Sequence, residues 1–244
     1  DSALCYYQQA LNYYRSVDNQ EDLAVALDNI GQLYESAGFP IKSKNLFTEA
    51  EKINRKYQNN YHLVSNLNNL ALYYKNISQF DSALLLFQEV DSISLANGLR
   101  QDRAINFYNR ANVFYAKKEY KEALTNYDSS LKICNEIHMD YGVMLISSHK
   151  ARILVVQGKD QEAEKLWEKA IAISKANAYL SFPAQLEGLK AEAYELANKY
   201  KKALEASNKK RTLEDNAKSD KQSKLISNLI KYYEVDIKNR EIIH

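Results

Sequence analysis

Residues that interrupt helices are scarce in this sequence. Its 244 residues include only 6 glycines and 2 prolines, the two residue types that most often mark turns and helix ends. Hydrophobic residues make up 45% of the chain, but no stretch has the length and apolarity of a membrane-spanning helix. The composition predicts an all-helical chain with an ample core, and nothing in it requires β-strands.

Residues of catalytic and metal sites are scarce as well. The 4 histidines (His62, His138, His149 and His244) show no i, i+4 pairing and lie near no cluster of cysteines or carboxylates. There is no glycine-rich phosphate loop and no nucleophile elbow. We therefore expect no catalytic residue, no metal and no cofactor. The 2 cysteines, Cys5 and Cys134, are not expected to pair, which leaves the redox compartment open.

An excess of charge of one sign is also missing. The formal net charge is +2, and no stripe of lysine and arginine with interleaved aromatic residues is present. Proteins that bind nucleic acids usually carry such a basic footprint. We therefore expect this segment not to bind nucleic acid.

What the sequence does contain is a repeat of 40 residues. Small residues recur at one place of the repeat, and further small residues follow each of them by twelve positions. A large aromatic residue follows four positions later in four of the five repeats, and Ser207 stands at the fifth. The three sets are Gly31, Ala71, Ala111, Ala151 and Ala191; Ser43, Ala83, Ala123, Ala163 and Ala203; and Phe47, Phe87, Tyr127 and Trp167.

Such a pattern predicts a solenoid of antiparallel helical hairpins. Two helices approach closely only where the facing positions carry small side chains, and the aromatic residue then fills the space between hairpins. Leu67, Leu70, Ala71 and Tyr74 share one helical face, as a first helix of a hairpin requires. Short polar stretches such as residues 116–119 are expected to form the turns.

The segments NNLALYYKNISQFDSALLLFQEV (68–90) and NRANVFYAKKEYKEALTNYDSSL (109–131) resemble the tetratricopeptide repeat (TPR), in a long form of 40 residues. The resemblance implies a right-handed superhelical solenoid. We expect it to cover residues 1–217, with a partial repeat at 1–20 followed by five full repeats, and to end in a longer helix. Because residues 1–4 copy residues 81–84, the chain is expected to begin inside a repeat, as a piece of a longer protein.

Asparagines are the candidate binding residues. Asn29, Asn69 and Asn109 stand two positions before the small residue in successive repeats, and Asn68 and Asn112 lie beside them on the first helices. In this family the first helices line the concave groove, and asparagines in segments like Asn68-Asn69-Leu70-Ala71 hold a peptide backbone. An amide suits that role because it both donates and accepts hydrogen bonds. The alternative is that these asparagines bond the neighbouring repeat or solvent.

Tyr108, Tyr115, Lys75 and Arg152 are the further candidates for lining this groove. Each of them also suits an ordinary packing role. The amide column stops at His149 and Leu189, so the groove is expected to change from neutral amides to mixed charge, which favours a peptide or protein ligand. One position before the small residue stand Arg110, Lys150 and Lys190. Their stems are expected to pack while the charges reach solvent, and the alternative is a docking edge for an acidic partner.

Residues 218–244 depart from the repeat. We expect a basic helix that either caps the solenoid or, through Ile226, Ile230, Tyr233 and Ile237, forms a short coiled coil and a homodimer. Residues 198–242 resemble the end of TPR sensor regions in Bacteroidetes two-component proteins, where a membrane span and a histidine kinase or LuxR-type output follow. This resemblance implies an extracytoplasmic sensor domain of a membrane-anchored regulator. The alternatives are a cytoplasmic peptide-binding regulator and a protein-assembly adaptor.

Overall fold

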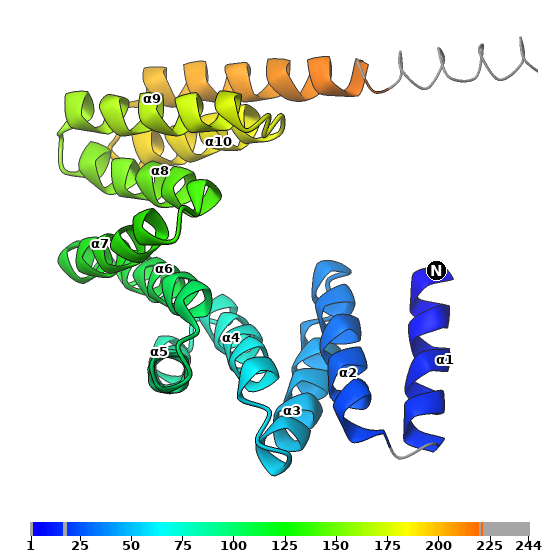
Figure 1. The fold of residues 1–244 in the computed structure, drawn as a ribbon. Coiled ribbons are helices and arrows are strands. Elements are labelled where there is room, and N and C mark those ends of the chain that lie inside the picture. Colours follow the sequence, from blue (N-terminus) through cyan, green and yellow to red (C-terminus); the bar gives the residue numbers. More distant parts are fainter. Residues whose placement is uncertain (1, 17–18, 220, 222–244) are drawn as a thin grey trace, which may run out of the picture. The chain divides into compact units, whose positions relative to one another are not determined.

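The computed structural model describes residues 2–16, 19–219 and 221. Figure 1 labels the helices α1 to α10, and a further helix covers residues 200–219. The ten are α1 (Ser2–Ser16), α2 (Gln20–Ser36), α3 (Pro40–Lys56), α4 (Asn60–Asn76), α5 (Phe80–Ala96), α6 (Arg100–Ala116), α7 (Tyr120–Glu136), α8 (Asp140–Val156), α9 (Asp160–Ala176) and α10 (Phe182–Leu196). The described residues contain no strand, which confirms the predicted all-α class.

Every connection between helices from α2 to the helix at 200–219 reverses the chain in the same way. The second residue of the connection has a positive φ, as at Ser78 (61°) and Gly158 (79°). Around Ser78, the Gln79 amide donates to the Tyr74 carbonyl at 2.9 Å and the Ser78 amide donates to the Lys75 carbonyl at 3.0 Å. This is the Schellman motif, which satisfies the last carbonyl groups of a helix. It explains how the chain makes so many turns with so few glycines.

The chain divides into two compact units, residues 1–146 and 147–244. In the first unit α2 packs on α3, α4 on α5 and α6 on α7 as antiparallel hairpins, and α1 packs on α2. The first helices of successive hairpins also touch, because α2 contacts α4 and α4 contacts α6. The predicted hairpins are therefore present in the first unit, and the partial repeat at 1–20 stays a prediction.

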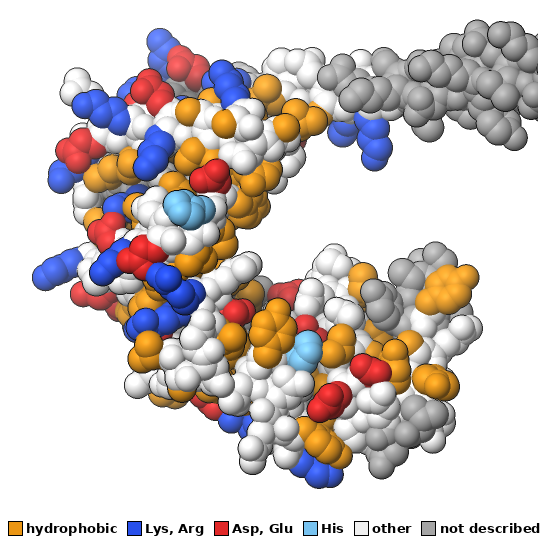
Figure 2. Space-filling model, in the orientation of Figure 1, with side chains coloured by type: hydrophobic (Ala, Val, Ile, Leu, Met, Phe, Trp, Pro, Cys, Tyr) orange, Lys and Arg blue, Asp and Glu red, His pale blue; other side chains and the backbone are white. Residues whose placement is uncertain are grey.

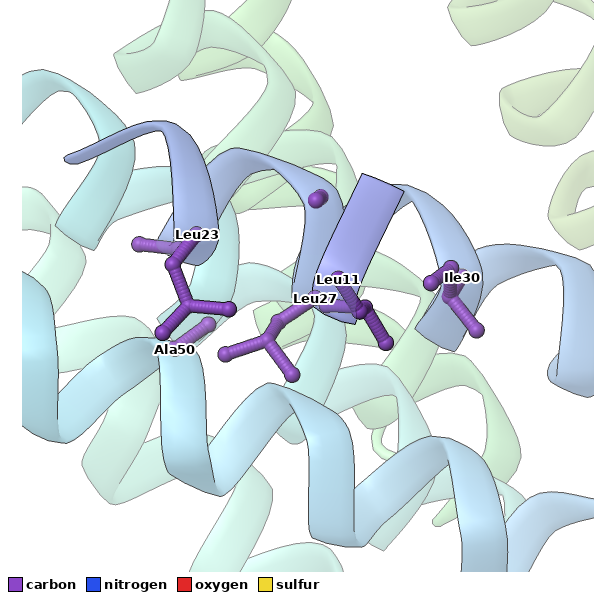
Figure 3. Close-up of a cluster of buried hydrophobic side chains, with 7 residues drawn as sticks. Leu11, Leu23, Leu27, Ile30 and Ala50 are labelled. Carbon is purple, nitrogen blue, oxygen red and sulfur yellow. The ribbon is translucent and has the colours of Figure 1, made fainter. Parts of the chain in front are cut away.

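The repeating residues form the core of the first unit, as expected. Ala71, Ala83 and Phe87 are all fully buried and pack in one cluster. Figure 3 shows the corresponding core near the N-terminus, where Leu11 of α1 lies against side chains of α2 and Ala50 of α3. The aromatic ring fills the space that the small residues leave, so helix pairing and hairpin packing depend on the same positions.

The second unit contains the rest of α8, α9, α10 and the helix at 200–219. Trp167 is buried and its indole donates to the Ser148 carbonyl at 3.3 Å. Asp160 binds the ammonium groups of Lys199 and Lys202, the latter at 2.8 Å. Burial alone would raise the pKa of Asp160, but the two lysines hold it below its usual value.

The predicted terminal segment at 218–244 lies almost wholly outside the described residues. The described helix at 200–219 runs past the predicted solenoid boundary at 217 without a break. The coiled-coil seam from Ile226 to Ile237 and the homodimer it suggests stay predictions. Within the part of the chain that the structure describes, no helix has the length and apolarity needed to cross a membrane.

Candidate functional site

The three asparagines of the amide column have different surroundings. Asn29 on α2 is exposed, and Asn69 on α4 is half-buried. Asn109 on α6 is buried, with 8% of its surface exposed. Asn69 donates through Nδ2 to Asp28 at 2.9 Å, whereas the side chains of Asn29 and Asn109 form no hydrogen bond with any described residue. The column is therefore in register along α2, α4 and α6, but one of its members is partly used inside the protein.

Asp28 of α2 forms hydrogen bonds within α2 and with α4, and it was not among the residues predicted from the sequence. Its Oδ1 accepts hydrogen bonds from Asn66 at 2.6 Å and from Asn69 at 2.9 Å, and its Oδ2 accepts one from Gln32 at 2.8 Å. Asn66, which is 1% exposed, in turn accepts a hydrogen bond from Asn54 of α3. The carboxylate of Asp28 therefore links α2 to α4, and Asn66 extends this network to α3.

Asn68 and Tyr108 stand at the place of Asp28 in the next two repeats. Asn68 is buried, and its Oδ1 accepts no hydrogen bond from a described residue. The Tyr108 ring packs on the Tyr127 ring, with 6.0 Å between centroids, and the Tyr127 hydroxyl donates to Asn112 Oδ1 at 2.6 Å. Asn112 is therefore held by the aromatic core of its own hairpin.

The remaining candidates are engaged in local contacts. The Tyr115 ring packs on Tyr120, with 5.9 Å between centroids. Lys75 is half-buried, and burial lowers the pKa of its ammonium although the nearby Glu35 carboxylate opposes that shift. Burial likewise raises the pKa of Glu35, against the effect of Lys75.

Arg152 belongs to the second unit and is not brought together with the asparagines by any described contact. Its guanidinium, which is buried, pairs with Glu192 and lies 3.0 Å from His149 Nδ1. Arg152 therefore neutralises the charge of Glu192 within its own unit. Its predicted role in lining a groove stays a prediction.

At two of the three basic positions before the small residue, the charged group lies against an aromatic ring. The Arg110 guanidinium lies 5.7 Å from the centre of the Phe107 ring. The Lys190 ammonium lies 4.7 Å from the centre of the Trp167 ring and 3.2 Å from the Glu164 carboxylate. On the face drawn in Figure 2, Lys and Arg side chains are interspersed with Asp and Glu side chains.

An apolar cavity of about 380 Å³ lies beside Asn109, within the first unit. Side chains of α4, α6, α7 and α8 line it, and we call it the α6–α8 cavity. Its apolar lining includes Leu72, Ile105, Tyr108, Cys134, Leu145 and Ile146. Cys134 is a free thiol with no exposed surface, and burial raises its pKa although Ser130 opposes that shift.

Gly142 allows α8 to approach α7 at the floor of this cavity. A Cβ atom at this position would lie 2.6 Å from Cys134 Sγ and 2.8 Å from Met139 Cε, both far below contact distance. Neither the cavity nor Gly142 was predicted from the sequence. The signal in the sequence was Gly142 itself, a glycine inside a helix of a chain that has only 6 glycines.

The described residues contain no cluster of three or more His, Cys, Asp or Glu side chains able to hold a metal ion. The cavity lining carries no Asp, Glu, Lys, Arg or His side chain among the described residues. Its chemistry therefore suits the binding of apolar groups next to the amides of Gln101 and Asn109.

No family model matches the sequence, and no curated protein matches it. Several solved structures do resemble it. BtubC (BKLC) from P. vanneervenii has a TM-score of 0.70 and 16% identity over 88% of this chain and 91% of its own. The TPR-like repeats of a kinesin light chain from Podospora anserina have a TM-score of 0.61 and 18% identity over 82% and 98%.

A Rap protein complexed with Competence and Sporulation Factor has a TM-score of 0.69 and 16% identity over 88% of this chain and 70% of its own. At such identities the likeness establishes the fold alone. The chain has the fold of TPR-like helical-repeat proteins, which confirms the predicted repeat fold. The likeness to two-component sensor regions remains a matter of sequence resemblance.

Proposed function

We propose that this chain is a non-enzymatic TPR scaffold that binds an extended peptide or protein segment. The binding surface is the first-helix face, defined by Asn29 on α2, Asn69 on α4 and Asn109 on α6. One observation carries this proposal: amides in register on three successive first helices keep unused hydrogen-bonding groups. Asn29 and Asn109 keep both donor and acceptor, and Asn69 keeps its Oδ1. An extended backbone presents N–H and C=O groups at regular intervals and can pair with such a row.

The solved structures support this proposal at the level of the fold. The Rap protein was crystallised with Competence and Sporulation Factor, and the Rap conjugation gene regulator of plasmid pLS20 with the Phr* peptide. We infer by analogy that the first-helix face of this chain takes a ligand of the same chemical class. The site has no group of titratable residues arranged for catalysis, so the proposal assigns it binding alone.

Selection from a phage-displayed library of random dodecapeptides tests the proposal. Replacing Asn29 and Asn109 together by alanine is expected to weaken the binding of the selected peptides by at least about fivefold, because each lost hydrogen bond contributes about 0.5–1.5 kcal/mol. The matched control is Asn45→Ala, which removes an exposed amide from the second helix α3. Peptides whose affinity is equal for the wild type and the double variant would place binding elsewhere.

We further propose that the chain is the extracytoplasmic sensor part of a membrane-anchored bacterial signalling regulator. The resemblance at residues 198–242 supports this, and the helix at 200–219 supplies the start of a connecting element. The parent gene tests it: a signal peptide is expected upstream, and an apolar stretch of about 20 residues soon after residue 244. A cytoplasmic peptide-binding regulator or an assembly adaptor would instead have continuous polar sequence on both sides.

A further inference from the structure

We propose that the α6–α8 cavity takes one large apolar side chain of the bound segment, while Asn109 binds the peptide group next to that side chain. This inference rests on the proposed function and makes it specific: the ligand is a peptide with a tryptophan, phenylalanine or leucine at one fixed position.

The size of the cavity is the first argument. Its volume is about 380 Å³, and a dry protein cavity of roughly 150 Å³ already admits benzene. A phenyl or indole ring therefore fits with room for the first atoms of a backbone. Because Gly142 has no Cβ atom, Cys134 and Met139 can stay in their observed positions. The shape of the cavity therefore depends on a position that only glycine can occupy without displacing them.

The chemistry of the lining is the second argument. Leu72, Ile105, Leu145 and Ile146 present aliphatic surface, and Ser130 gives its hydroxyl to the Ala104 carbonyl at 2.7 Å. No side chain of the lining, among the described residues, carries a charge at neutral pH. Transfer of an ionised group into such a space is strongly unfavourable, so the cavity excludes acidic and basic side chains.

Asn109 is the third argument, because it indicates a peptide and not merely an apolar molecule. Its side chain lines the cavity, is more than nine-tenths buried, and bonds no described residue. Its amide atoms still reach solvent, so both the donor and the acceptor are open to a ligand in the cavity. A peptide group beside an apolar side chain offers Asn109 both a donor and an acceptor. Asn69 and Asn29 continue the same row of amides along α4 and α2, where the rest of an extended segment would lie.

The probe for the test is N-acetyltryptophanamide, which has one indole ring flanked by two amide groups, and binding is followed by NMR titration of the full chain. N-acetylglutamine amide serves as the polar probe. We expect the tryptophan probe to bind and the glutamine probe to bind at least about tenfold more weakly. The glutamine amide would be buried in an apolar cavity without a hydrogen-bond partner, which is unfavourable.

Two variants locate the site. Ile105 lines the cavity and is 37% exposed, so Ile105→Glu places a carboxylate at the rim. This variant is expected to weaken the binding of the tryptophan probe at least about tenfold. Asn109→Ala is expected to lower the affinity for the tryptophan probe about threefold to tenfold. The matched controls are Leu85→Glu, which changes an exposed leucine of α5, and Asn45→Ala on α3. Thermal unfolding of each variant checks that the fold is retained.

The outcomes separate this inference from the proposed function. Dodecapeptides that depend on Asn29 and Asn109 but share no apolar position would leave the proposed function intact and overturn this inference. Equal affinity of the tryptophan and glutamine probes, or an unchanged affinity in Ile105→Glu, would also overturn it. Binding of the tryptophan probe that is insensitive to Asn109→Ala would indicate a small apolar ligand in place of a peptide.

Discussion

The same substitution, glycine to alanine inside a helix, is expected to have opposite effects at two places in this protein. A Cβ atom at Gly31 of α2 would lie 2.5 Å from Cε1 and 2.7 Å from Cδ1 of Phe47. Phe47 has no exposed surface, so its ring has no free space into which it can turn. At Gly188 of α10 the nearest atom to a new Cβ is Cδ of Lys210, at 3.4 Å, near the end of a flexible side chain.

Two terms set the size of each effect. Alanine is favoured over glycine in a helix interior by about 0.8–1.0 kcal/mol, and this gain applies at both sites. Overpacking of a filled core costs about 1–3 kcal/mol and applies at Gly31 alone. We therefore expect Gly188→Ala to raise the free energy of unfolding by about 1 kcal/mol and Gly31→Ala to lower it by about 1 kcal/mol.

Urea unfolding followed by circular dichroism measures both changes. Because repeat arrays need not unfold in one step, amide hydrogen exchange in the α2–α3 hairpin is the second measurement for Gly31→Ala. A Gly31→Ala variant as stable as Gly188→Ala would refute the reasoning, since it would mean that the contact with Phe47 relaxes without cost.

Three further predictions concern single sites. Asp28→Ala is expected to lower the free energy of unfolding by about 2–4 kcal/mol, because it leaves the buried amide of Asn66 without its charged acceptor; urea unfolding measures this, and a loss below about 1 kcal/mol would contradict it. Asp160 has a folded-state pKa below its unfolded value of 3.8, so the stability it adds is present above that pH and is lost as the pH falls through the folded pKa. The free energies of unfolding of the wild type and Asp160→Asn are expected to differ by about 1 kcal/mol or less at pH 7 and to converge in acid. A difference that stays constant with pH would refute this. Ala178 has a φ of 54°, where a Cβ atom is disfavoured, so Ala178→Gly is expected to raise the free energy of unfolding by about 0.5–1 kcal/mol and with it the melting temperature. An unchanged or lower melting temperature would show that the turn holds no such strain.

The repeat of the sequence determined the helices and their order. The small residues and the aromatic residue recur in phase, and packing of this kind is local to each hairpin, so the pattern alone predicted where helices lie. The polar stretch at 116–119 was expected to form a turn, and α6 ends at Ala116 while α7 begins at Tyr120. The described residues include nine turns built on a left-handed residue, and these were not expected, because just three of those residues are glycines.

The candidate residues of the site were identified by position, but their states were not. Asn29, Asn69 and Asn109 are equivalent in the repeat, yet they are exposed, bonded to Asp28 and buried without a partner, respectively. The partner of Asn69, Asp28, lies on another helix, 41 residues away, and the residues at the place of Asp28 in the next two repeats are Asn68 and Tyr108. A single sequence shows the period, but not which side chains of neighbouring repeats meet.

The sequence by itself therefore determined the all-helical class, the hairpin repeat and the faces of its helices, because these depend on local periodicity and on the size of residues at fixed spacing. The tertiary structure alone decided which amide remains unpaired and where space remains between helices. The α6–α8 cavity exists because side chains from four helices, with Gly142 at its floor, leave a volume unfilled. Such a volume is a property of packing in three dimensions, and no single segment of the chain encodes it.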